Sequence, residues 1–287
     1  DKVLKIGTVH QCNCCLGSKT LHPLVSVIDL SKADLSPHMD IKFGFYTILL
    51  SECKCEAYAY GHQCCDFSDG TLVCLTPGES ISMKENNKEF PSKGWILAFH
   101  PDLICGTPLG LNIHNYTFFS YCPEEALHLS LREKQIILEF LERIRQELER
   151  CIDRHSKKII SKYIELLLDY CTRFYERQFI TRSEVNKKVF REFNHLLDNH
   201  FNVKVSLSTD VLSDEYCANL LHLSPAYFND LLKYEIGKEF KEYIQFKRFE
   251  IAKGWLVNTD KTLGQIAQEL GFSNSQYFSR LFKKITG

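Results

Sequence analysis

The chain has 287 residues, of which 44% are hydrophobic and 25% charged, and its formal net charge is −1 at pH 7. This length accommodates two domains of ordinary size, and the composition excludes a disordered, collagen-like or low-complexity protein. No apolar run approaches the roughly 18–20 residues of a membrane-spanning helix, and no basic segment followed by an apolar one resembles an export signal. We therefore expect a cytoplasmic protein without a membrane partner.

Thirteen cysteines are the most unusual feature of the composition. All but one lie at or before Cys171, and only Cys217 follows. An odd count in a chain without an export signal argues against a disulfide-stabilised scaffold. Three roles remain open for these residues: reduced thiols of the core, ligands of a metal, or parts of a redox sensor.

The first part of the chain, residues 1–122, carries short apolar runs separated by proline and glycine. The clearest runs are residues 24–28, 43–50, 71–75 and 95–99. Because these runs are short and lack the 3.6-residue period of helices, they predict β-strands in a compact sandwich or barrel. The run at 43–50 is expected to form one buried strand.

Residues 123–186 have a helical pattern instead. Two apolar stripes advance in steps of four and three residues, as on one face of an α-helix. The first stripe is Ile137, Leu141, Ile144, Leu148 and Cys151, and the second is Ile160, Ile164, Leu167, Cys171 and Phe174. Either the two helices pack on the β domain as an antiparallel pair, or the first helix forms the seam of a dimer. A third helix is expected over residues 184–201, followed by a polar connector at 202–211.

The last part of the chain contains an internal repeat. The order Ala, Leu, apolar residue, Ser, Tyr-Phe, Leu, Lys runs from Ala218 to Lys233 and again from Ala267 to Lys283. Self-similarity at this distance indicates a duplicated supersecondary unit. A long helix, expected over residues 239–257, joins the two copies.

Each copy has the features of a helix-turn-helix. The small side chains of Ala218 and Ala267 allow the second helix to cross close to the first, and Gly271 supplies the positive φ that the turn requires. Ser224 and Ser273 are expected to cap the second helices by accepting hydrogen bonds from first-turn amides. The Tyr-Phe and Leu positions then face the core, and the residues between them face outward.

This tandem arrangement resembles the DNA-binding domain of the AraC/XylS family of bacterial transcription regulators. The resemblance covers residues 187–287 and is most specific at 266–287, IAQELGFSNSQYFSRLFKKITG. The phrase GWILAFHPDL at 94–103 is similar to the effector domain of Bacteroidetes-type members and implies a cupin-like β barrel. The expected fold class is therefore α+β multidomain. It would comprise a cupin-like β barrel at 1–122, a helical linker or dimerisation region at 123–186 and an all-α tandem helix-turn-helix domain at 187–287.

Two residues of the first copy depart from the second. His222 stands where the second copy has Gly271, so the first turn either carries a small backbone cost or holds His222 in the left-handed region. Asp230 stands where the second copy has Arg280. Because a carboxylate does not bind phosphate favourably, Asp230 either accepts a hydrogen bond from a cytosine amino group or pairs locally with Lys233.

The resemblance implies that the second helix of each copy enters the major groove of double-stranded DNA. Gln276 suits adenine, Arg280 suits guanine or phosphate, and three lysines (Lys233, Lys283 and Lys284) are expected to contact phosphates. The candidate DNA-binding residues are Pro225, Ala226, Asn229, Asp230, Lys233, Asn274, Ser275, Gln276, Ser279, Arg280 and Lys283.

The sequence gives no support for an enzyme, a cofactor or a metal site in the N-terminal part. The histidines there never form the His-x-His pair of metal-dependent cupins, and neither a nucleophile elbow nor a phosphate-binding glycine loop is present. The cysteines lack the Cys-x-x-Cys pairs of zinc ribbons. Most thiols are therefore expected to be small buried hydrophobic side chains, with a metal or redox role left open for the cluster at 12–15.

The resemblance also implies a small-molecule effector inside the barrel. Tyr46, Tyr58, Tyr60 and Phe99 are the candidate lining residues, with ordinary aromatic packing as the other interpretation. Expected partners are operator or promoter DNA, the effector, a second copy in a homodimer, and RNA polymerase if the protein is an activator. The alternative is a ligand-independent DNA-binding regulator whose barrel serves dimerisation or a thiol- or metal-sensing role.

Overall fold

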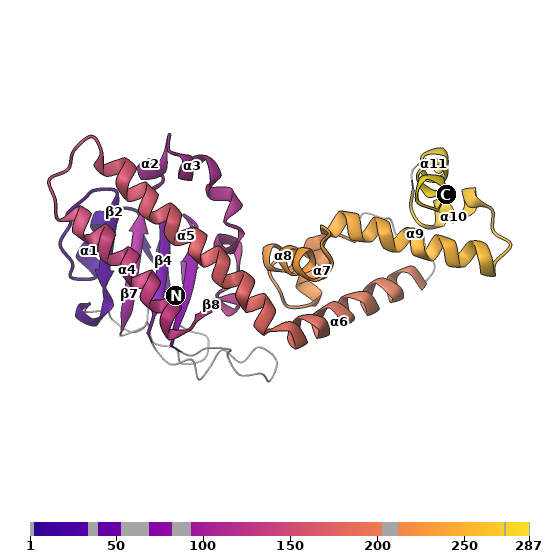
Figure 1. Cartoon of the computed structure of the whole chain (residues 1–287), viewed down its shortest axis with the longest axis horizontal. Coiled ribbons are helices and arrows are strands. Elements are labelled where there is room, and N and C mark those ends of the chain that lie inside the picture. The colour runs from indigo at the N-terminus through magenta and orange to yellow at the C-terminus, as the bar shows by residue number, and fades with distance from the viewer. Residues whose placement is uncertain are drawn as a thin grey trace. The chain divides into compact units, whose positions relative to one another are not determined.

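A computed structural model describes residues 3–33, 40–52, 69–81, 93–202, 212–272 and 274–286 (Figure 1). The chain forms two compact units, Asp1–Arg182 and Ser183–Gly287, and each is described by itself. The first unit combines helices and sheets, whereas every element of the second is a helix in the described ranges. No helix in these ranges has the length and apolar character that crossing a membrane requires.

Two sheets form the β part of the first unit. The larger sheet has five strands in the order β2 (Val25–Asp29), β7 (Gly94–Phe99), β4 (Tyr46–Ser51), β5 (Gly70–Leu75) and β8 (Leu127–Leu129), each antiparallel to its neighbours. The smaller sheet has the order β1 (Val3–Ile6), β3 (Asp40–Phe43) and β6 (Ser80–Ile81), with β1 and β3 parallel. Within the described strands the two sheets remain separate, without a closed barrel.

The expected single strand over residues 43–50 is wrong, because the chain changes sheet at Gly44. Strand β3 ends at Phe43 and β4 begins at Tyr46. The Gly44 N–H donates to the Ile6 carbonyl oxygen at 2.8 Å. A Cβ atom on Gly44 would lie 3.0 Å from the carbonyl oxygen of Gly7, so this close backbone approach favours glycine.

The two striped helices are α4 (Leu131–Leu148) and α5 (Ser156–Thr181). The α4 stripe is buried from Ile137 to Leu148, and the helix packs against α5, β2 and β8. This confirms the interpretation in which the helices pack on the β domain, and it leaves the first stripe unavailable to a second copy. Cys151, the last residue of the predicted stripe, lies beyond the end of α4 and is exposed.

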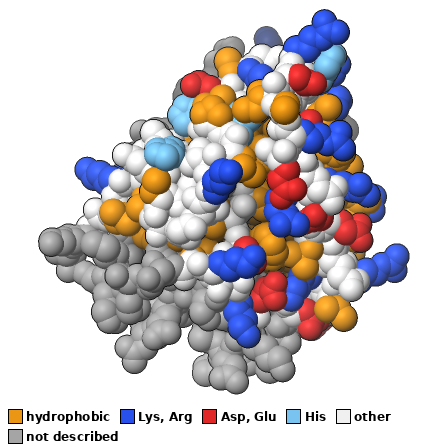
Figure 2. Space-filling view, turned by 90° about the vertical axis from the view of Figure 1, so that its left-hand side faces the viewer, with side chains coloured by type: hydrophobic (Ala, Val, Ile, Leu, Met, Phe, Trp, Pro, Cys, Tyr) orange, Lys and Arg blue, Asp and Glu red, His pale blue; other side chains and the backbone are white. Residues whose placement is uncertain are grey.

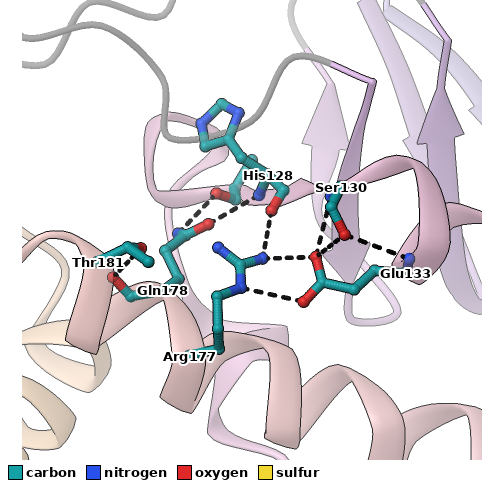
Figure 3. Close-up of polar contacts among 7 residues, drawn as sticks. His128, Ser130, Glu133, Arg177, Gln178 and Thr181 are labelled. Carbon is teal, nitrogen blue, oxygen red and sulfur yellow. Dashed lines mark hydrogen bonds and ion pairs between the residues drawn. The ribbon is translucent and has the colours of Figure 1, made fainter.

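A polar network joins the end of α5 to β8 and to the start of α4 (Figure 3). The Arg177 guanidinium donates to both carboxylate oxygens of Glu133, at 3.0 and 2.8 Å, and to the His128 carbonyl oxygen at 2.7 Å. The buried Gln178 amide accepts from the His128 N–H at 2.8 Å and donates to the Ala126 carbonyl oxygen at 3.2 Å. These bonds fix the last turns of α5 against the sheet.

Replacing Gln178 with leucine is expected to lower the free energy of unfolding of the first unit by about 2 kcal/mol. Two buried backbone groups lose a hydrogen-bond partner, and each such bond contributes about 1 kcal/mol. The measurement is urea unfolding followed by the fluorescence of Trp95 in a Trp255→Phe background. Gln146→Leu, the same change on the exposed face of α4, should have little effect. Equal effects of the two substitutions would contradict the role of Gln178.

Shorter elements complete the first unit. They are α1 (Val9–Cys15), α2 (Pro101–Ile104) and α3 (Pro108–Asn112), with 3₁₀ turns at Leu30–Lys32, Ile113–Asn115, Thr117–Ser120 and Pro123–Glu125. Helix α1 begins at a capping box, in which Thr8 accepts from the Gln11 N–H and the Gln11 side chain accepts from the Thr8 N–H.

The second unit is built around the long helix α9 (Phe240–Asn258). The other helices are α6 (Ser183–Asn202), α7 (Asp214–Leu220), α8 (Pro225–Ile236), α10 (Leu263–Glu269) and α11 (Ser275–Thr286). The helices expected over 184–201 and 239–257 are confirmed as α6 and α9, and the connector beyond Asn202 lies outside the described residues.

Two aromatic clusters form the core of the second unit. The first cluster is Phe193, Phe228, Phe240 and Tyr243, with neighbouring ring centroids 5.0 to 6.1 Å apart. The second cluster is Phe249, Phe272, Phe278 and Phe282, with centroids 4.6 to 6.3 Å apart. Helix α9 contributes to both, so it connects two helix pairs that each have their own core.

Candidate nucleic-acid interface

The two repeats fold into helix pairs with matching turns. The Leu223 N–H donates to the Ala218 carbonyl oxygen at 2.9 Å, and the Phe272 N–H donates to that of Ala267 at 2.9 Å. The first helices, α7 and α10, have seven residues each, and the second helices, α8 and α11, have twelve each. Ala218 and Ala267 are fully buried, as expected where the second helix crosses close to the first. The predicted helix-turn-helix duplication is therefore confirmed.

Both turns use a residue with positive φ. Gly271 has a φ of 75°, and His222 in the first copy has a φ of 56°. The expectation that His222 occupies the left-handed region is confirmed. Because a side chain in this region is disfavoured by about 1 kcal/mol, the first turn is held by its surroundings rather than by local preference.

Helix α8 begins at the cap predicted for it. The Ser224 Oγ accepts from the Tyr227 N–H at 3.2 Å, and Pro225 occupies the first helical position, where no amide is needed. Ser273, the corresponding predicted cap of α11, lies outside the described residues.

The outward face of α8 carries Ala226, Asp230 and Lys233, which are spaced by four and three residues. Ala226 and Asp230 are half-buried and Lys233 is exposed. The opposite face is buried through Tyr227, Phe228, Leu231 and Leu232. The side chains predicted to meet DNA are thus separated from those that pack in the core.

Helix α11 presents the same three positions, occupied by Gln276, Arg280 and Lys283. All three side chains are exposed, whereas Phe278 and Phe282 on the other face are buried. Gln276, Arg280 and Lys283 stand 50 residues after Ala226, Asp230 and Lys233, so the two second helices present equivalent faces.

The remaining candidate residues differ in their surroundings. The Asn229 amide nitrogen donates to the Asp214 carboxylate at 2.9 Å, so Asn229 braces α8 against α7. Pro225 and Ser279 are half-buried, and Asn274 is exposed just before α11. Ser275 begins α11, but its side chain lies outside the described residues, as does that of Lys284.

The charges of the two second helices are unequal. Helix α11 contains no acidic residue in its sequence, whereas α8 contains Asp230 and Glu235 beside Lys233. Positive charge is therefore concentrated on α11. By contrast, the face of the first unit seen in Figure 2 mixes basic, acidic and hydrophobic side chains.

Arg248 was missed by the sequence reasoning. It lies on α9 with its guanidinium 5.6 Å from the Phe272 ring centroid, next to the turn of the second copy. Burial lowers the pKa of Arg248, and its Nε has no hydrogen-bond partner among the described residues. The signal in the sequence is an arginine directly before the buried Phe249 and one helical turn after the buried Ile244. Its contact with the Phe272 ring links α9 to the turn of the second helix pair.

Two of the four candidate effector residues lie in a packed aromatic cluster. The Tyr46 and Phe99 rings stack at 5.1 Å, and the Phe119 ring meets Tyr46 at 5.3 Å. Burial raises the pKa of the Tyr46 hydroxyl. Tyr58 and Tyr60 lie outside the described residues.

A cavity of about 420 Å³ lies elsewhere in the first unit. Its walls include Leu16, Ser26, Trp95 and Leu148, from the end of α1, β2, β7 and the end of α4. Neither Tyr46 nor Phe99 lines it. In the described ranges no group of three or more His, Cys, Asp or Glu side chains is arranged to hold a metal ion.

Comparison with known proteins places similarity mainly in the second unit. A family model described as a helix-turn-helix domain matches residues 217–287. The HTH-type transcriptional regulator YtdP of Bacillus subtilis is 34% identical over 104 residues, which is 36% of this chain and 14% of that protein. The bifunctional transcriptional activator and DNA repair enzyme AdaA of the same organism is 40% identical over 79 residues, 28% of this chain and 37% of that protein.

A longer match reaches beyond the second unit. The HTH-type transcriptional regulator YijO of Escherichia coli is 23% identical over 217 residues, which is 76% of this chain and 73% of that protein. This chain matches less than two fifths of the length of YtdP and of AdaA. Those matches therefore concern the helix-turn-helix region and not the whole relatives. All three relatives are transcriptional regulators by name.

Proposed function

The chain carries an AraC-type helix-turn-helix DNA-binding domain at its C-terminal end, and we propose that it regulates transcription by binding one duplex site through both α8 and α11. The observation that carries this proposal is the pair of matching turns, each followed by a twelve-residue helix with an exposed lysine at the same outward position. DNA binding through only one helix pair would not account for the presence of the same geometry in both copies.

Two such helices enter two successive major-groove segments, about 34 Å apart along the duplex. On α11, Arg280 and Gln276 would read base edges, because their planar groups pair bidentately with guanine and adenine. Lys233, Lys283 and Lys284 would contact phosphates and fix the register. On α8, Asp230 would accept from a cytosine amino group, and Asn229 would act mainly through its bond to Asp214.

Selection from a pool of random duplexes tests this function with the full chain. Repeated binding and amplification should enrich a common sequence. Enriched duplexes should also bind more tightly than the starting pool at the same salt concentration. Failure to enrich any sequence, with binding that depends on salt alone, would overturn the proposal.

We propose that the β-rich part, expected at residues 1–122, is a cupin-like sensory domain that binds a small-molecule effector. The cavity near Trp95 has room for such a ligand, and its lining combines apolar side chains such as Leu16 and Leu148 with charged ones such as Arg145. Thermal shift with a metabolite panel, followed by DNA binding with each stabilising compound, tests the proposal. A compound that stabilises the protein but leaves DNA affinity unchanged would favour the ligand-independent alternative.

We also propose that the protein forms a homodimer whose interface lies on α5. Helix α5 has an outward stripe of Ile159, Tyr163, Leu166 and Tyr170 in steps of four and three residues, in addition to its buried stripe. Antiparallel pairing of two α5 helices about Leu166 would cover this stripe in both copies.

Replacing Leu166 with glutamate is expected to shift the protein from dimer to monomer. The Leu166 side chain is 45% exposed in the single chain, so the change should leave its fold intact. Light scattering after size-exclusion chromatography gives the mass. Leu111→Glu, the same change at a site that is 73% exposed on α3, is the matched control and should remain dimeric. An unchanged mass for Leu166→Glu would remove α5 as the seam.

A further inference from the structure

Helix α1 brings a cysteine and a histidine together on the surface of the first unit. Cys14 and His10 stand one helical turn apart, and the Cys14 Sγ lies 3.6 Å from the His10 Nε2. Cys14 is exposed. A thiol within hydrogen-bond reach of an imidazole is the arrangement by which proteins activate a nucleophilic sulfur.

The His10 ring is held in place from its other nitrogen. The His10 Nδ1 lies 2.9 Å from the Thr20 Oγ1, which also accepts from the Asn13 amide at 3.1 Å. Asn13 is fully buried, and its carbonyl oxygen accepts from the Ser26 hydroxyl of β2 at 2.7 Å. A chain of hydrogen bonds therefore runs from the sheet to the ring and fixes the direction in which Nε2 points.

The neighbouring cysteines provide a contrast within the same helix. Cys12 is fully buried, and burial raises the pKa of its thiol to about 12, which keeps it protonated. Cys15 is exposed like Cys14 but makes no hydrogen bond among the described residues. Cys14 thus combines exposure with a positioned histidine, and its two neighbours each lack one of these features.

We propose that Cys14 is a reactive thiol that forms a mixed disulfide with a low-molecular-weight disulfide, with His10 as the base. The Cys14 S–H proton passes to His10 Nε2, and the sulfur attacks one sulfur of the disulfide. The S–S bond of the small molecule breaks, and its departing sulfur takes the proton from Nε2. Cys14 is oxidised to the mixed disulfide, and one half of the small molecule is reduced to a thiol.

Thr20 has a defined part in this step. Nε2 can accept the thiol proton only if the ring carries its hydrogen on Nδ1, so Nδ1–H must have an acceptor. The Thr20 hydroxyl oxygen has two lone pairs, which suit the Nδ1–H and the Asn13 amide. The same acceptor also stabilises the imidazolium that forms when the proton arrives.

The test compares Cys14 with Cys15 in one peptide of the full-length protein. The reduced protein is treated with hydroxyethyl disulfide, a neutral probe. Mass spectrometry of the peptide 6–19 then gives the rate at each cysteine. Because His10 lies within reach to accept the Cys14 proton during the attack, whereas Cys15 makes no such contact in the described ranges, we expect Cys14 to react about tenfold faster than Cys15.

Two variants and one control separate activation from simple accessibility. Thr20→Val removes the acceptor and keeps the side-chain shape, and His10→Gln removes the base at an exposed position. Both should bring the Cys14 rate down to that of Cys15. An unchanged Cys15 rate in each variant indicates that α1 is intact. Thr20→Ser retains the hydroxyl and should keep the fast rate.

Equal rates at Cys14 and Cys15 in the natural protein would overturn the proposal, and so would an unchanged Cys14 rate in His10→Gln. If Cys12 reacts with the probe in Thr20→Val, α1 has lost its packing in that variant. The His10→Gln variant then decides whether His10 activates Cys14. DNA takes no part in these measurements, so their outcome is independent of the proposed function.

Discussion

Replacing Arg280 with alanine is expected to weaken binding of the full chain to a selected duplex by about 10- to 100-fold, while the protein stays folded. Arg280 is exposed on α11, where Phe278 and Phe282 on the opposite face form the core. A bidentate contact to a base contributes about 1–3 kcal/mol, which corresponds to this loss. Fluorescence anisotropy with a labelled duplex at constant salt measures the change.

Two control variants define what Arg280 does. Lys188→Ala removes one positive charge from an exposed position on α6 and should change affinity by less than about twofold, because surface charges distant from DNA are screened. Arg280→Lys keeps the charge but not the planar fork. If Arg280 contacts a phosphate, Arg280→Lys should bind DNA nearly as tightly as the natural protein. If Arg280 reads guanine, Arg280→Lys should lose most of the affinity that Arg280→Ala loses. Affinity unchanged in Arg280→Ala would remove the residue from the interface.

Replacing Phe278 with alanine is expected to unfold the second helix pair and to abolish sequence-specific DNA binding. Phe278 is fully buried, and its ring contacts Phe249, Phe272 and Phe282. Removing a buried phenylalanine destabilises a protein by about 3–5 kcal/mol, which is comparable to the whole stability of a small domain. Because the second cluster is separate from that of Phe228, the first helix pair should keep its structure.

The two tryptophans allow this prediction to be tested in each unit. Trp95 lies on β7 in the first unit, and Trp255 lies on α9 in the second. Urea unfolding of Phe278→Ala should show a large loss of stability by Trp255 fluorescence in a Trp95→Phe background. The urea midpoint reported by Trp95 in a Trp255→Phe background should not change. Equal loss in both units would contradict the separation of their cores. Phe228→Ala should likewise destabilise only the second unit.

The helix-turn-helix repeat was predictable because its determinants are local. Caps, turn residues and the spacing of buried side chains all fall within about twenty residues of one another, so they can be identified in the sequence. The left-handed conformation of His222 followed in the same way, from its alignment with Gly271. The bond between Asn229 and Asp214 did not, since it depends on how two helices cross.

The β part was less predictable because its determinants are distant in sequence. Three of the four expected runs each became one strand. The fourth, at 43–50, breaks at Gly44 because of a backbone contact with Gly7, and no local pattern encodes such a contact. Tyr46 and Phe99 were proposed as effector contacts from residue type alone, whereas their placement depends on the pairing of β4 with β7. The Cys14–His10–Thr20 cluster joins a short helix to the segment that follows it, and its alignment is likewise a matter of packing.

If α8 and α11 read two adjacent major-groove segments of one duplex, the selected DNA sequence should show it. The most direct measurement is the sequence pattern selected from random duplexes by the natural protein and by two variants, Arg280→Ala and Asp230→Ala. Binding by both helices predicts two preferred blocks whose centres lie about 10 base pairs apart. Arg280→Ala should lose only one block and Asp230→Ala only the other. A single block in the natural protein, or loss of the same block in both variants, would contradict binding by both helices.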